Sequence, residues 1–115
     1  MLKKGMILFH ATKSGFIRIR GPAFFAPSLS LAREECPGKC RILVFALKKR
    51  IKTNEFKDND FVAWMVAAYG IKKTKHQAYE HIRSFKNGRK YKEVVMRTPS
   101  RTLKFIGEFT FGLEL

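Results

Sequence analysis

The chain has 115 residues, of which 45% are apolar. This length has room for one domain with a modest core, residues 1–115, and we expect no second domain. Its 24 Lys and Arg residues against 9 Asp and Glu give a formal net charge of +15, a density that repels itself in a compact fold. We therefore expect a polyanionic partner, with nucleic acid first. The alternatives are an acidic protein or ribonucleoprotein complex, attraction to a membrane surface, and solubility alone.

Membrane and export signals are missing from the pattern. The longest apolar stretches, residues 42–47 and 61–69, fall short of the roughly 20 residues that span a bilayer. The first eight residues lack the apolar region and cleavage site of a signal peptide. We therefore expect a cytoplasmic protein without a membrane partner.

The two cysteines, Cys36 and Cys40, flank a Pro-Gly-Lys turn. Such a pair can be a local disulfide, half of a metal site, or two ordinary turn residues. There is no second Cys pair, and His10, His76 and His81 are scattered, so we expect no metal. In a reducing cytoplasm both cysteines should be free thiols in a turn.

Short strands are predicted in the first half of the chain. Residues 6–10 and 23–26 read as strands, and Ser28 is the expected N-cap of a helix that reaches Glu35 and ends before Pro37. Residues 41–47 are almost continuously apolar, which indicates a strand buried on both faces.

The second half of the chain is predicted to hold two helices followed by strands. Residues 61–69 are apolar nearly all round and predict a core helix, and a capping box at Thr74 predicts a helix that ends at Asn87 and buries Ala78, Ile82 and Phe85. Residues 91–96 predict a strand and 98–101 a turn. Alternate apolar residues from 103 to 115 predict the inward side of a long final strand or hairpin. The sum is an α+β domain.

Three pieces of sequence occur in an informative order: residues 8–12 (LFHAT), residues 21–28 (GPAFFAPS) before the first helix, and residues 92–96 (KEVVM) before 103–107. Together they resemble the ADP-ribosyltransferase family, in the branch shared by poly-ADP-ribose polymerases and diphtheria toxin, which includes small phage-encoded members. The family pattern is a His on the first strand, an aromatic residue before a helix and a Glu on a late strand. The resemblance implies a split β-sheet core with short helices between the early and late strands; residues 54–90 carry none of it.

The resemblance also implies a chemistry, with NAD as the substrate and no metal. Breaking the bond between nicotinamide and ribose develops positive charge on the ribose, which a carboxylate stabilises, and Glu93 is the residue that would do so. The plain alternative is that Glu93, a lone acid after the basic run 89–92, only neutralises its neighbours. A carboxylate entering an apolar strand is costly unless it is used.

The remaining family positions would bind the NAD molecule. His10 would hydrogen-bond the adenosine ribose, while the backbone near Ala11 would hold the nicotinamide amide and Thr12 would shape the pocket. Phe24 or Phe25 would stack on nicotinamide, and Ser28 would assist near the helix start. The plain alternative is that both phenylalanines belong to the core and His10 is a satisfied rim residue.

The sequence departs from the family at three positions. Ala11 stands where a Gly is usual, a second stacking aromatic is absent near Glu35, and Tyr91 occupies the place where relatives that modify Arg carry an acid or Gln. An Arg-directed activity is therefore disfavoured.

Basic residues form three clusters that would contact phosphates and give affinity with little sequence preference. The residues expected to bind nucleic acid are Lys48, Lys49, Arg50, Lys52, Lys72, Lys73, Lys75, Lys86, Arg89, Lys90, Lys92, Arg97 and Arg101. Tyr69, Tyr79 and Tyr91 lie among them and would stack on bases or pack in the core.

Three functions follow from these observations. The first is an enzyme that transfers ADP-ribose from NAD to a macromolecular acceptor, with nucleic acid as one candidate. The second is a catalytically inactive relative that uses the fold as a basic binding module, for example to inhibit a host system. The third is an RNase-like toxin in which His10 and Glu93 act as acid and base beside a basic clamp.

Overall fold

Two β-sheets and two short helices make up the described part of the computed structural model, which comprises residues 1–13, 19, 23–57, 78–84 and 88–112, with the backbone alone at 54–57, 83 and 84. The first sheet has the order β1 (Ile7–Thr12), β3 (Cys40–Leu47), β7 (Leu103–Phe111), all antiparallel. The second has the order β2 (Ala23–Phe25), β6 (Lys90–Met96), β5 (Ala78–Ser84), β4 (Thr53–Lys57), antiparallel except for β4 and β5. The helices are α1 (Leu29–Glu35) and α3 (Pro99–Thr102). This confirms a mixed α+β fold.

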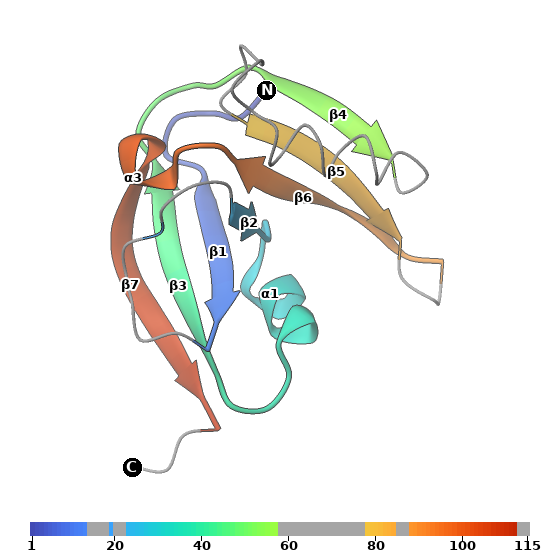
Figure 1. Ribbon diagram of the computed structural model, residues 1–115, viewed down its shortest axis with the longest axis vertical. Helices are drawn as coiled ribbons and strands as arrows, with labels where there is room; N and C mark the ends of the chain where they lie inside the picture. The colour runs from blue at the N-terminus through green and yellow to red at the C-terminus, as the bar shows by residue number, and fades with distance from the viewer. Residues whose placement is uncertain (14–18, 20–22, 58–77, 85–87, 113–115) are drawn as a thin grey trace.

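The main core lies between the two sheets. Leu8, Leu43 and Phe45 of the first sheet and Phe25 and Val94 of the second belong to one buried cluster. In Figure 1 the strands of the first sheet run along the long axis, β2 lies beside β1, and β4, β5 and β6 run obliquely at the upper right. Between the sheets, one isolated bridge pairs Phe9 with Ala26.

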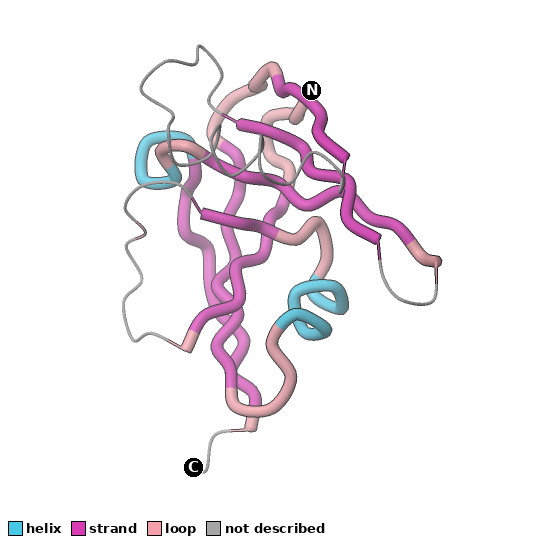
Figure 2. The backbone as a smooth tube through the Cα atoms, turned by 45° about the vertical axis from the view of Figure 1, so that its right-hand side comes forward, coloured by secondary structure: helices cyan, strands magenta, loops and turns pink. Residues whose placement is uncertain are grey.

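Helix α1 forms where the sequence predicts it. The hydroxyl of Ser28 accepts a hydrogen bond from the backbone N–H of Leu31 at 3.3 Å, which satisfies one of the unpaired donors at the helix start. Ala32 then packs with Ile42 and Phe9 on the outer side of the first sheet. Figure 2 shows α1 beside the strands rather than between them.

The predicted helix that ends at Asn87 is wrong over residues 78–84, which form strand β5. Strand β5 lies between β4 and β6, and Ala78, Tyr79 and His81 are all buried. Burial on both faces removes the alternation of a half-buried strand, so the apolar residues matched a helical spacing by coincidence. Strand β4 was missed because only one of its five residues, Phe56, is apolar.

The final strand does not bury the predicted side. Leu103 is buried, but Phe105 and Phe109 are 36% and 44% exposed. Phe105 pairs with Phe45 whereas Gly107 pairs with Val44, so Ile106 is an extra residue that shifts the register. The expected alternation fails because of this bulge and because β7 is the outer strand of its sheet among the described residues. The turn before it, expected at 98–101, is helix α3.

The prediction of free thiols is wrong, because Cys36 and Cys40 form a disulfide. The Pro-Gly turn between them has Gly38 at a φ of 82° and brings their Cα atoms to 6.2 Å, within the range that a disulfide requires. The expectation rested on the predicted compartment and not on this local geometry.

Several predictions fall outside the described residues. They are the helix at 61–69, the capping box at Thr74, and the basic residues Lys72, Lys73, Lys75 and Lys86. In the part of the chain that is described, no helix is long and apolar enough to cross a membrane.

The core assignment predicts a contrast between two truncations. Leu43 is fully buried between the sheets, whereas Ile106 is 50% exposed. We expect Leu43→Ala to lower the free energy of unfolding by about 2–5 kcal/mol through lost burial and a cavity. Ile106→Ala should change it by less than about 1 kcal/mol. Urea titration followed by circular dichroism measures both values, and equal losses would contradict the assigned core.

Candidate functional site

His10 of β1 is held against the second sheet by its ring. The carbonyl oxygen of Phe24 lies 2.7 Å from His10 Nδ1 and can only accept, so Nδ1 carries the proton. The imidazole also lies 5.2 Å, centroid to centroid, from the ring of Phe25. Burial lowers the pKa of His10 from its ordinary value of 6.5, and the hydrogen bond to Phe24 offsets part of that shift.

The two phenylalanines of β2 have different surroundings. Phe25 is 1% exposed and lies edge-on to Phe45 at 5.6 Å, so its ring is part of the core. Phe24 is half-buried. Because neighbouring residues of a strand point to opposite faces, Phe24 is the one of the pair on the face away from the core.

Glu93 of β6 lies directly opposite His81 of β5, and both side chains are buried. The distance from His81 Nδ1 to Glu93 Oε2 is 3.3 Å. A buried carboxylate requires a polar partner, and the imidazole supplies one. Local sequence patterns do not connect His81 with Glu93, because no cross-strand pairing can be inferred for a segment whose spacing predicts a helix.

The strand pattern places His10 and Glu93 on opposite faces of the second sheet. The ring of His10 contacts Phe25, and Phe25 pairs with Val94 and shares its core face. Glu93 is the neighbour of Val94, so it points to the other face. The structure therefore brings Phe24 and Glu93 to one face of the sheet and His10 to the other.

Helix α1 is connected to β6 by its two acidic residues. The hydroxyl of Tyr91 donates to a carboxylate oxygen of Glu35, and Arg89 Nη2 lies 2.6 Å from Glu34 Oε1. The hydroxyl of Ser28 serves as the N-cap and lies 3.2 Å from the hydroxyl of Ser30. Ser28 thus has a structural role at the helix start.

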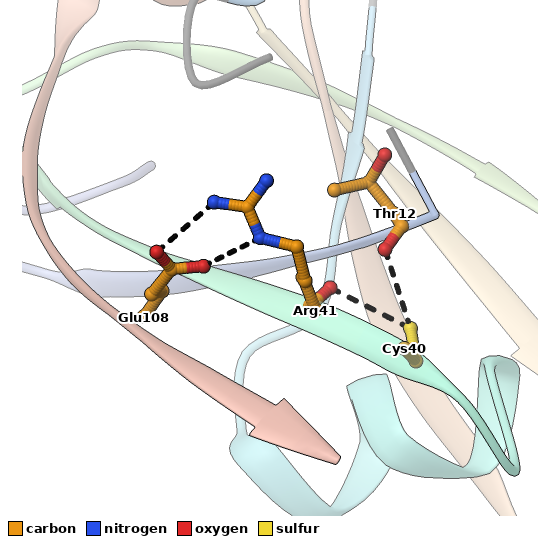
Figure 3. Close-up of polar contacts among 4 residues, drawn as sticks. All are labelled: Thr12, Cys40, Arg41 and Glu108. Atoms are coloured by element: carbon orange, nitrogen blue, oxygen red, sulfur yellow. Dashed lines mark hydrogen bonds and ion pairs between the residues drawn. The ribbon is translucent and has the colours of Figure 1, made fainter. Parts of the chain in front are cut away.

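The end of β1 lies beside the start of β3. Ala11 pairs with Ile42 and packs on the α1 side, and Thr12 pairs with Arg41. Arg41 donates to both carboxylate oxygens of Glu108, from Nε at 2.7 Å and from Nη2 at 3.0 Å (Figure 3). This bidentate contact holds the pKa of Glu108 below its ordinary value and raises that of Arg41.

Three segments meet at the end of β3: the N-terminal segment, the segment that follows β3 and helix α3 (Figure 1). Leu2 and Ile51 exchange backbone hydrogen bonds of 2.8 and 2.9 Å, and the N–H of Lys48 donates to the carbonyl of Thr102 at 2.9 Å. The segments 1–6, 47–52 and 97–102 contain no acidic residue. We call their seven exposed Lys and Arg residues close to these bonds the β3-end patch: Lys3, Lys4, Lys48, Lys49, Arg50, Lys52 and Arg101.

The β3-end patch includes residues that the sequence analysis did not select. Lys3 and Lys4 are far from the predicted clusters in the sequence, and the bridge between Leu2 and Ile51 brings them close. Arg97, which was predicted to bind nucleic acid, is half-buried before α3. Only the pairing of the N-terminal segment with the segment after β3 identifies these lysines, and no local signal predicts it.

The basic residues at the start of β6, and Arg89 just before it, lie in a different charge environment. Arg89 contacts Glu34, and Lys92 Nζ lies 3.6 Å from Glu80 Oε2. Lys90 is exposed on the same strand. Acidic side chains therefore offset part of the charge here. Glu80 also lies 3.9 Å from the N-terminal nitrogen of Met1, next to the β3-end patch, whose own three segments contain no acidic residue.

The described residues include no group of three or more His, Cys, Asp or Glu side chains that could hold a metal ion. Comparison of the chain with protein-family models, with curated proteins and with solved structures found no match. The functional conclusion therefore rests on the geometry of this chain.

The environment of His10 predicts a pH dependence of stability. The folded state lowers the pKa of His10 below 6.5, so the unfolded chain takes up a proton first as the pH falls. The stability that comes from neutral His10 is fully present above the unfolded pKa of 6.5. It is lost as the pH falls from that value to the lower pKa of the folded state. We expect wild type to lose more unfolding free energy than His10→Asn between about pH 7.5 and about pH 5.5. Urea titrations at each pH measure this difference, and parallel pH profiles would contradict it.

Proposed function

We propose that this protein is a basic binding module that docks nucleic acid through the β3-end patch. The observation that carries the proposal is the convergence of seven exposed cations from three segments that contain no acidic residue. Cations held close together by the backbone repel one another, and a phosphate chain relieves that repulsion while releasing its own counterions.

The composition of the patch favours phosphate contacts over base recognition. Five of its members are lysines, which act as point charges, while Arg50 and Arg101 can bind phosphate oxygens with two hydrogen bonds each. Contacts of this kind position a nucleic acid without reading its sequence. We therefore expect a binding affinity that falls steeply with salt concentration and depends little on nucleotide sequence.

The surroundings of Glu93 favour binding over catalysis. Glu93 is only 5% exposed and shares a buried contact with His81. His10 points to the opposite face of the second sheet, so the two residues do not converge on one substrate atom. A general acid and base acting on one bond would require that convergence.

Two matched triple variants test the proposed surface. Lys48, Lys49 and Arg50 replaced by Ala should weaken binding of fluorescein-labelled DNA and RNA duplexes and reduce the salt slope by about 3. Arg89, Lys90 and Lys92 replaced by Ala remove the same charge and should change affinity much less, because Glu34 and Glu80 already offset two of these residues. Fluorescence anisotropy at several salt concentrations measures both.

Equal loss in the two variants would mean that net charge alone drives binding and would contradict a defined patch. Binding that ignores ionic strength would contradict the electrostatic mechanism. If heparin and an acidic protein bind through the patch while both nucleic acids do not, the partner class is wrong.

Transfer of ADP-ribose from NAD is the second candidate function. The observation that favours it is the pairing of β2 with β6, which brings Phe24 and Glu93 to one face, within a two-sheet fold compatible with the split core that the resemblance implies. Transfer requires a conformation in which Glu93 leaves His81.

Incubation with labelled NAD and DNA, RNA or protein acceptors tests the transfer reaction. The binding module predicts no transfer of label. Label transfer that is lost in Glu93→Gln would instead establish the enzyme, and transfer that survives this substitution would remove Glu93 as the essential group. RNA cleavage without NAD would support the RNase-like reading.

A further inference from the structure

The disulfide between Cys36 and Cys40 closes a short loop between two elements that are already neighbours in the chain. Cys36 follows α1, and Cys40 is the first residue of β3. Their separation of four residues means that the bond removes little conformational freedom from the unfolded chain. The stabilisation expected from closing so short a loop is at the low end of the range for disulfides, which leaves room for another role.

The two sulfur-bearing residues differ in their access to solvent. Cys40 is 2% exposed and belongs to the buried cluster between α1 and the first sheet. Cys36 is half-buried at the edge of that cluster. A reagent in solution can therefore approach the disulfide from the side of Cys36.

Cys40 has oxygen neighbours that suit a thiol. Its Sγ lies 3.6 Å from the carbonyl oxygen of Thr12 and 3.5 Å from that of Arg41, as Figure 3 shows. A disulfide sulfur carries no proton, so these are close contacts in the oxidised form. A Cys40 thiol at the same position can donate to either carbonyl. The S–H group that reduction creates is therefore buried beside hydrogen-bond acceptors.

The loop is also held together without its disulfide. Arg33 Nη1 donates to the carbonyl of Cys36 at 2.9 Å and to that of Gly38 at 2.7 Å. The same guanidinium lies 4.4 Å from the ring centroid of Phe111 in β7. These contacts do not depend on the disulfide, so they can hold the loop shape when the bond is broken.

We propose that the Cys36–Cys40 bond is an exchangeable disulfide and that Cys36 Sγ is the atom at which a thiol from solution attacks. The thiolate forms a bond to Cys36 Sγ, the bond between the two protein sulfurs breaks, and its electron pair leaves with Cys40 Sγ, which takes a proton from water. A second thiolate attacks the external sulfur, releases the external disulfide and leaves Cys36 as a thiol. Two external thiols thus supply the two electrons.

Single serine variants locate the reactive sulfur. Cys40→Ser leaves Cys36 alone, and glutathione disulfide should convert it to a glutathione adduct that intact mass spectrometry detects. Cys36→Ser leaves the buried Cys40, which should react at least about tenfold more slowly because the reagent cannot reach it. The same reaction in urea should modify both variants at similar rates, which shows that the native difference comes from the fold.

Wild type provides the second measurement. We expect reduced glutathione to open the disulfide in the native protein, with the mixed disulfide mapped to Cys36 after acid quenching and digestion. Faster reaction at Cys40 in the native state, equal native rates in the two variants, or a native disulfide that resists glutathione while the urea-unfolded chain is reduced would each overturn the proposal. A circular dichroism spectrum of each variant before reaction establishes that it is folded.

Discussion

The two backbone hydrogen bonds between Phe9 and Ala26, at 2.9 and 2.7 Å, determine how the two sheets are joined. They connect β1 directly to the residue that follows β2, so the carbonyl of Phe24 comes within reach of His10 and the ring of Phe25 enters the core. They also fix the direction in which the chain leaves β2 toward Ser28, which places α1 on the outer side of the first sheet. Successive side chains of β2 point to opposite faces of the second sheet. With Phe25 in the core, Phe24 therefore lies on the other face, which is also the face of Glu93.

The sequence predicts the elements whose signals are local. Ser28 before an apolar helix face, the apolar run at 41–47 and the strand at 91–96 each specify their structure within a few residues, and all three are confirmed. The helix predicted over β5 is wrong because the burial of this strand depends on β4 and β6, which lie elsewhere in the sequence. His81 could be recognised as the neighbour of Glu93 only after that pairing was known. The disulfide was discounted for a reason unrelated to the geometry of the turn.

The acidic residues are distributed unevenly, so some of the basic residues have counter-charges within the fold. Glu34 and Glu80 contact Arg89 and Lys92, and Glu108 contacts Arg41, so these cations have counter-charges within the fold. Exposed ion pairs add little to stability, yet they reduce the local potential where they occur. The end of β3 is built from segments that contain no acid, so its exposed Lys and Arg side chains have no counter-charge within those segments.

The three segments of the β3-end patch carry like charges, so the fold must hold them together against repulsion. The N-terminal segment, the segment after β3 and helix α3 would separate by repulsion if only side chains connected them. Backbone bonds from Leu2 to Ile51 and from Lys48 to Thr102 connect them instead, and buried Leu2, Leu47 and Ile51 lie beneath in the main core. Backbone hydrogen bonds and apolar burial are insensitive to salt, whereas the repulsion between exposed lysines is screened by it. The fold therefore keeps the patch assembled on its own, so the binding that we propose would not first have to order the cations that make the contacts.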